Sequence, residues 1–473
     1  MTVFLVLLFA LLALFLFSGD WRRGLLLTVV IGFLQDPIRK LTPGQPGLYV
    51  GLVLVSFLAC SFVLWQRNCN RFDLSLMFPT TPSLHRVFPL FVGLIVLQAV
   101  HSLVRWGIPS RTLIGMGFYL APLLGLWMGF QVGRFQPFLR LLLKLYLLCT
   151  AVFAFTALLD YLGSDLKLFD AIGGGQIIHF RYGFWTEGAV GLWRSTDMAA
   201  IHLTIASCLA IVFALSGAVG INRIAWLLLS FFFAITSLLT GRRKAVAQIV
   251  VFCLLFFILV ARYGPVRSRH QIWGLILSAI SLAAFVFVLG PSQLLGDDFA
   301  EYIDRAGSVR SDLLQRFQVL GLYAAQRGLD ISGGIGLGVG TLAQTGASGV
   351  AGVQGAGFVF VSESGIGKVF AELGWPGIVV LLFLFKGLYR ALHHSLRMMK
   401  YESAYSGCLE IGLLSLALSN LPFFSAAAGV YGDPFVLIIS GLSLGSVFAV
   451  PTPKSQARLI ASKDVMHNNS TPA

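Results

Sequence analysis

The sequence predicts an all-α membrane protein, a polytopic helical bundle of about 12–13 spans with one large external loop that contains an amphipathic helix. Apolar residues make up 57% of the 473-residue chain and charged residues only 11%, whereas soluble domains carry about 25% charged residues. Apolar runs of about 20 residues, the length that a membrane-spanning helix needs, recur along the chain. Backbone groups in hydrocarbon must bond within their own segment, so runs this long favour helices over barrel strands.

The apolar runs also give the order of the spans. The second run is short and is either a span or a re-entrant segment, which leaves about twelve or thirteen spans open. We expect spans to begin near residues 2, 24, 47, 87, 112, 139, 198, 223, 245, 272, 369, 405 and 431. The expected organisation is a membrane bundle at 1–290 with a shorter external loop at 163–197, a large external loop at 291–367, C-terminal spans at 368–450 and a cytoplasmic tail at 451–473.

The distribution of Lys and Arg sets the orientation. The connection at 386–400 is rich in basic residues, the next one at 425–433 has none, and the tail at 451–473 is basic again. Because cytoplasmic connections carry the excess of Lys and Arg, the tail is expected in the cytoplasm and the loop at 291–367 outside. The net charge of +14 lies mostly in such connections, so it does not predict a nucleic-acid partner.

A cluster of three cations is an exception to the excess of Lys and Arg on the cytoplasmic side. Arg242, Arg243 and Lys244 interrupt two apolar runs, and counting back from the C-terminus places them on the outer side. An anionic ligand explains a cluster there, since the planar fork of Arg binds phosphate with two hydrogen bonds and Lys adds a point charge. The alternatives are a miscounted span and an anchor for lipid headgroups.

The large external loop contains an amphipathic helix followed by a glycine-rich stretch. Arg310 and Arg316 lie off the apolar stripe of this helix. The acidic residues at 297–304 have neither an EF-hand spacing nor a His partner, so they predict a solvated face and no metal site. The glycines at 333–340 predict a flexible loop or a close approach of backbone to a ligand. The stripe itself consists of Leu313, Leu314, Phe317, Leu320 and Tyr323.

Two carboxylates follow the glycine-rich stretch. Glu363 lies just before a helix that enters the eleventh span, and Glu372 follows nine residues later. A carboxylate beside apolar helices at the water interface suits a general base. The structural alternatives are an acid at a helix N-terminus for Glu363 and a buried hydrogen-bond partner for Glu372.

Three stretches in order resemble the O-antigen ligase and polysaccharide repeat-unit polymerase superfamily of bacterial envelope enzymes. SLLTGRRKAVAQIVVFCLL is similar to the family's turn between two central spans, and RSDLLQRFQVLGLYAAQRGLDISGGIGLGVGT to its external helix and glycine-rich segment. SESGIGKVFAELGWPGIVVLLFLF is similar to its entry into the next span. The resemblance covers roughly residues 200–450, and the first 160 residues match only as apolar spans.

The resemblance implies an inverting, metal-independent glycosyltransferase of the bacterial inner membrane, without cofactor. Such an enzyme takes a polyprenyl-pyrophosphate-linked oligosaccharide at the outer leaflet and transfers it to an acceptor glycan. The large loop is then periplasmic, and membrane lipid, flippase and chain-length regulator proteins are the expected partners. The resemblance places Arg242 or Arg243 and Arg310 at the pyrophosphate, with Lys244 and Arg316 as further candidates.

At one position this sequence differs from the ligases of the superfamily. Ligases often have His where this chain has Glu363, which favours polymerisation of exopolysaccharide, capsule or O-antigen repeat units and makes Glu363 the candidate base. O-antigen ligase, a non-enzymatic flippase for lipid-linked glycan and a non-catalytic scaffold remain alternatives. In the shorter external loop, the candidate sugar-binding residues are Arg181, Trp185 and Arg194, although aromatic residues also belong at any membrane interface.

Overall fold

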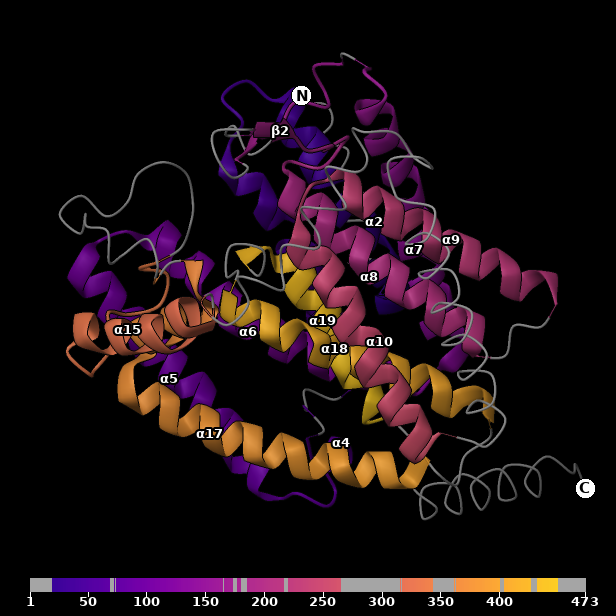
Figure 1. Cartoon of the computed structure of the whole chain (residues 1–473). Helices are drawn as coiled ribbons and strands as arrows, with labels where there is room; N and C mark the ends of the chain where they lie inside the picture. The colour runs from indigo at the N-terminus through magenta and orange to yellow at the C-terminus, as the bar shows by residue number, and fades with distance from the viewer. Residues whose placement is uncertain are drawn as a thin grey trace, which may run out of the picture.

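The computed structural model is a bundle of long helices, which confirms the expected all-α fold class (Figure 1). Within the described residues, nine helices are long and apolar enough to cross a membrane. The expected spans near residues 2 and 272 lie outside the described residues. The structure describes residues 19–68, 72, 74–164, 166–172, 177–179, 185–216, 220–264, 315, 317–342, 361, 363–399, 404–426 and 432–449.

The helices follow the order expected from the apolar runs. The first half contains α2 (Trp21–Leu41), η1 (Gly47–Gly51), α3 (Leu52–Arg67), α4 (Leu74–Met77), α5 (Ser83–Trp106), α6 (Pro109–Gly133) and α7 (Gln136–Tyr161). A two-stranded antiparallel pair follows, β1 (Ile177–His179) with β2 (Trp185–Glu187). The second half contains α8 (Thr196–Leu215), α9 (Ile221–Leu239), α10 (Arg243–Tyr263), the π-helix η4 (Phe317–Tyr323), α15 (Ala324–Ser332), α17 (Gly365–Met399), α18 (Ala404–Ala426) and α19 (Pro434–Val447).

The core of the bundle surrounds α8, nearly all of which is buried inside the protein. Elsewhere, glycine lets helices approach closely. Gly125 on α6 lies against Gly441 on α19, and Gly129 lies against Leu442. A Cβ atom at Gly445 would overlap the Leu126 carbonyl oxygen. Small residues four apart on facing helices are a common packing device in membranes, where no hydrophobic force drives helices together.

Successive helices alternate in direction, so their ends gather at two ends of the bundle. We call the end at which α8, α10, α17 and α19 begin the site end. Contacts between helix ends support this grouping. Lys40 near the end of α2 donates to the Gly191 carbonyl just before α8, at 2.8 Å. Phe424 near the end of α18 lies against Gly365, where α17 begins.

The glycine-rich stretch packs against helices at the site end. The Gly338 amide donates to the Glu372 carbonyl at 3.1 Å, and the Gln98 side chain donates to the Ile335 carbonyl at 2.8 Å. A Cβ atom at Gly340 would overlap the Arg111 carbonyl oxygen. These glycines were expected to form a flexible loop or to let backbone approach a ligand, whereas in the structure their backbone packs closely on α5, α6 and α17.

The apolar stripe expected in the external helix is wrong in its register. Leu320 is buried, but Phe317 and Tyr323 are 55% and 51% exposed. Residues 317–323 form a π-helix, whose wider turn shifts the face that a regular helical spacing would bury. The helix contacts α17 instead through small residues, since Gly328 lies against the Gly367 carbonyl. Leu313 and Leu314 lie outside the described residues.

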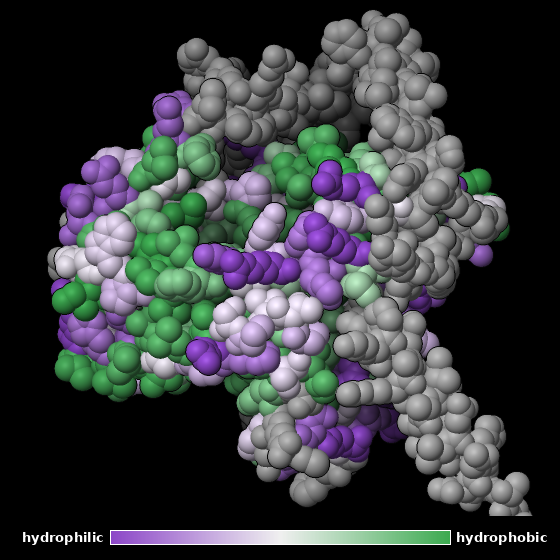
Figure 2. All heavy atoms as spheres, turned by 90° about the horizontal axis from the view of Figure 1, so that it is seen from below, coloured by the Kyte–Doolittle hydropathy of each residue, from purple (hydrophilic) through white to green (hydrophobic). Residues whose placement is uncertain are grey.

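Apolar side chains cover much of the outer surface, as expected of helices in contact with lipid. Figure 2 shows hydrophobic groups spread over the described part of one face, with hydrophilic groups gathered in patches. In Figure 1, α17 extends along the lower side of the view and α15 lies beside its N-terminal part. The long exposed apolar residues of α17 include Val379, Leu382 and Phe385.

Candidate functional site

The three cations of the α9–α10 turn lie beside the start of α8. Gly241 adopts φ 65°, the left-handed conformation that reverses the chain between the two helices. Arg242 Nε then donates to Thr196 Oγ1 at 2.7 Å. The carboxylate of Asp197 lies 3.4 Å from Arg242 and 2.5 Å from Lys244 Nζ. Two cations therefore meet at one carboxylate, and this trio carries net positive charge.

The turn and the start of α8 are held together by residues 189–195, which directly precede α8. The Ala189 amide donates to the Leu239 carbonyl at 3.0 Å, which fixes the loop to the end of α9. Ser195 caps α8 by accepting from the Met198 amide at 3.4 Å. The N-terminus of α8 carries a partial positive charge, so Asp197 is stabilised by the helix as well as by the two cations.

Arg194 belongs to a buried ion network. Its guanidinium lies 3.0 Å from Asp36 and 2.6 Å from Asp433, which are on α2 and just before α19. Burial opposes the charged form, yet the two carboxylates raise the pKa of Arg194 above its ordinary value. The guanidinium fastens the loop before α8 to two helices, and this geometry gives no support to the predicted sugar contact at Arg194.

The start of α17 presents a second group of polar residues at the site end. Glu363 is exposed just before the helix. Ser364 caps it, accepting from the Gly367 amide at 2.9 Å. Lys368, in the first turn, is only 5% exposed, and its ammonium lies 4.0 Å from the centre of the Phe118 ring on α6.

Glu372 is a structural hydrogen-bond partner, the second of the two roles considered for it. Its side chain is fully buried. One carboxylate oxygen accepts from the Tyr119 hydroxyl at 2.8 Å and the other from the Leu342 amide at 3.0 Å. It joins α6, α17 and the glycine-rich stretch. The backbone leaves helical geometry just beyond it, at Gly374 (φ 61°, ψ −163°).

The two polar groups lie at similar depth in the bundle. Gln248 on α10 donates to Asn420 on α18 at 2.7 Å. One helical turn from this bond toward the site end, α10 reaches Lys244 and α18 reaches Phe424, a rise of about 6 Å in each case. Phe424 contacts Gly365, where α17 begins. The cationic turn and the start of α17 are therefore both level with the last turn of α18.

Several predicted site residues lie outside the described residues. These are Arg181, Arg310 and Arg316. Trp185 begins β2 and pairs with His179 across the strand pair. Among the residues that the structure describes, no group of three or more His, Cys, Asp or Glu side chains is placed to hold a metal ion.

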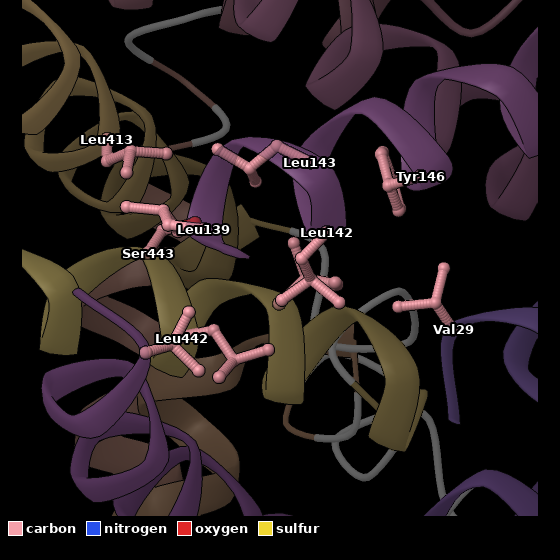
Figure 3. Close-up of a pocket in the computed structure, with 10 residues that line it drawn as sticks. Val29, Leu139, Leu142, Leu143, Tyr146, Leu413, Leu442 and Ser443 are labelled. Carbon is pink, nitrogen blue, oxygen red and sulfur yellow. The ribbon is translucent and has the colours of Figure 1, made fainter. Parts of the chain in front are cut away.

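A cavity in the bundle interior is lined almost entirely by apolar side chains, as Figure 3 shows. The Tyr146 hydroxyl, on this wall, is within 2.8 Å of His202 Nδ1. A binding pocket combines apolar walls with a few convergent polar groups, and Tyr146 and Ser443 are the polar residues that line this cavity, so we do not consider it a candidate site. Its other lining residues are Val29, Val132, Leu139, Leu142, Leu143, Leu413, Ile439 and Leu442.

Sequence reasoning missed Asp197 and Lys368. Asp197 follows a Ser-Thr pair directly before a long apolar run, a pattern that predicts a helix N-terminus but not its contact with the α9–α10 turn. Lys368 stands alone in an apolar stretch, four residues before Glu372. That spacing suggests an ion pair along one helix. In the structure, the Glu372 carboxylate instead accepts hydrogen bonds from Tyr119 and Leu342.

No protein-family model matches this chain, and a search of curated proteins finds no relative.

Proposed function

We propose that the chain transfers a glycan from a polyprenyl-pyrophosphate-linked donor to an acceptor sugar hydroxyl at the outer leaflet of the bacterial inner membrane. Polymerisation of exopolysaccharide, capsule or O-antigen repeat units is the form of this reaction that we favour. One observation carries the proposal: the cationic turn at 242–244 and Glu363 both lie at the site end, level with the last turn of α18. The resemblance of three stretches to glycan polymerases and ligases adds to it.

The reaction needs a cation clamp and a base. The bond from the sugar anomeric carbon to the pyrophosphate breaks, and its electron pair leaves with the pyrophosphate. Arg242, Arg243 and Lys244 stabilise that departing charge, since preorganised cations act most strongly where charge develops. The acceptor oxygen forms the new bond from the opposite face of the sugar, and its proton passes to the Glu363 carboxylate.

The contacts of the turn suit such a clamp. Thr196 and Asp197 hold Arg242 and Lys244 through short polar contacts. Side chains that are already ordered lose less entropy when a ligand binds. The turn lies at the end of two apolar helices, where the headgroup of a polyprenyl donor would meet it while the isoprenoid chain stays in lipid.

The test compares variants in cells that make the native polymer. Glu363→Gln should reduce transfer by about 10²–10⁴-fold, as expected for a general base. Arg242→Gln and Arg243→Gln should each reduce it by about 10²–10³-fold, as expected for loss of a charge-stabilising donor. The matched controls are Asp330→Asn, an exposed carboxylate on α15, and Arg262→Gln at the opposite end of α10. Both controls should keep polymer at the wild-type level.

The location of the accumulated intermediate separates the alternatives. Lipid-linked repeat unit that builds up in the outer leaflet supports the transferase. Build-up in the inner leaflet supports a flippase instead. Variants that still lengthen the lipid-linked glycan but do not transfer it to the final acceptor would make the chain a ligase. Normal polymer in a variant changed at 242, 243 and 363 together would refute the proposal.

A further inference from the structure

Lys368 is a buried cation in an unfavourable position. It lies in the first turn of α17 and is 5% exposed. Removing an ammonium group from water costs several kcal/mol unless another charge compensates it. The Phe118 ring, 4.0 Å away, supplies a cation–π contact, but such a contact offsets only part of that cost.

The nearest carboxylate on the same helix does not pair with Lys368. Glu372 lies one turn further on, yet its two oxygens accept from the Tyr119 hydroxyl and the Leu342 amide. Among the residues that the structure describes, no carboxylate forms an ion pair with the Lys368 ammonium. The ammonium therefore has no direct carboxylate partner in this part of the chain, and Glu372 acts on it only from a distance.

The helix end adds to this positive charge. Lys368 occupies the turn in which backbone N–H groups point out of α17, and Ser364 accepts from only one of them through its hydroxyl, that of Gly367. A helix N-terminus attracts anions and repels cations. A buried lysine placed there raises the local positive potential further, which is the arrangement of a site that binds an anion.

We infer that Lys368 and the first turn of α17 bind an anionic group of the glycan substrate, a phosphate or a sugar carboxylate. Binding of the anion itself is independent of the transfer reaction, while its assignment to the glycan substrate rests on the proposed function. Two sources share this chemistry. One is the diphosphate of the lipid-linked donor, and the other is an acidic sugar in the donor or acceptor.

The surroundings of Lys368 agree with a bound glycan. Phe118 stacks with Phe424 at a centroid distance of 6.2 Å, so aromatic rings lie beside the ammonium. Glu363 lies directly before the Ser364 cap of the same helix start. An anion on Lys368 would hold the substrate next to the carboxylate proposed as the base.

The experiment titrates the purified full chain in a neutral detergent with inorganic pyrophosphate and, separately, with glucuronate. Calorimetry measures the dissociation constants for wild type, Lys368→Met and Lys368→Arg. The Met variant keeps the apolar contact with Phe118 and loses the charge, while Arg stays charged in any environment. Lys386→Met, an exposed lysine further along the same helix, is the matched control. Lys368→Gln takes the place of the Met variant if the latter elutes as an aggregate.

We expect one of the two anions to bind wild type, Lys386→Met and Lys368→Arg with similar affinity, and Lys368→Met at least tenfold more weakly. Preference for pyrophosphate identifies the donor diphosphate, and preference for glucuronate identifies an acidic sugar. The inference is overturned if Lys368→Met binds as tightly as wild type, or if wild type binds neither anion. A chain that shows the charge-dependent binding but transfers no glycan from a lipid-linked donor would refute the proposed function and leave the anion site intact.

Discussion

Gln248 on α10 donates a hydrogen bond to Asn420 on α18 at 2.7 Å, and both side chains are buried. The bond sets the depth at which the two helices pass each other. Because the cationic turn lies one turn beyond Gln248 and Phe424 lies one turn beyond Asn420, this polar pair places the turn level with the residue that contacts the start of α17.

Breaking this pair should destabilise the bundle modestly. Gln248→Leu or Asn420→Leu leaves one buried amide without its partner, and we expect each to lower the free energy of unfolding by about 1 kcal/mol. The double variant should lose less than the sum of the two, because no unpaired amide remains. Unfolding in mixed micelles measures the three values, with Gln326→Leu on the exposed side of α15 as control. Additive losses would show that the two amides do not interact.

The Arg194 network should contribute much more to stability. Arg194→Gln leaves Asp36 and Asp433 buried without their cation, and breaking a buried pair in this way costs about 3–5 kcal/mol. The pair of Arg23 and Asp20, in which the Arg23 side chain is 80% exposed, provides the contrast. Arg23→Gln should change stability by no more than about 1 kcal/mol. Equal melting temperatures of the two variants in detergent would contradict the structural role of Arg194.

The spans could be predicted from the sequence because their cause is local. A span is a run of apolar residues, so the run expected near 245 is α10, which begins at Arg243, and the run expected near 198 is α8, which begins at Thr196. The cationic turn was found in the same way, since charges stand out against apolar neighbours.

The contacts around the turn could not be predicted because their cause is tertiary. Arg194 meets Asp36 and Asp433, which are far away along the chain, and no spacing rule relates the three. The Lys368–Glu372 spacing suggests an ion pair, but in the structure Glu372 accepts hydrogen bonds from Tyr119 and Leu342 instead. The predicted apolar stripe at 317–323 was wrong because these residues form a π-helix, whose turn is wider than that of the α-helix on which the prediction was based.

Two glycines of the same stretch should respond differently to substitution. Gly333 and Gly340 both have positive φ, 61° and 82°. A Cβ atom at Gly333 meets nothing within 4 Å, whereas one at Gly340 would overlap the Arg111 carbonyl oxygen. Gly333→Ala should cost about 1–2 kcal/mol for the left-handed backbone alone, and Gly340→Ala about 1–3 kcal/mol more for the overlap. Thermal unfolding in detergent compares them, and similar losses would show that the stretch does not pack tightly on α6.

Removing the Asp197 carboxylate should strengthen anion binding at the cationic turn. Asp197 lies close to both Arg242 and Lys244, so it competes with an added anion for their charge. A partly exposed ion pair is worth up to about 1 kcal/mol, so Asp197→Asn should tighten binding of inorganic pyrophosphate by about twofold to fivefold. The gain should shrink at high salt. Calorimetry with Asp330→Asn as control measures it, and weaker binding would mean that Asp197 acts mainly by positioning the cations.

The last prediction concerns which residues share a side of the membrane. Leu41 and Glu363 are exposed at the site end, and Ile221 is exposed at the opposite end. Single cysteines at these positions, in a chain without its native cysteines, should react with a membrane-impermeant maleimide in intact cells at 41 and 363. Position 221 should react only after permeabilisation, since the bundle separates the two ends. Different behaviour of 41 and 363 would contradict the fold itself. If both are reached only after permeabilisation, the cationic turn faces the cytoplasm, where no donor in the outer leaflet can reach it, and the proposed function fails.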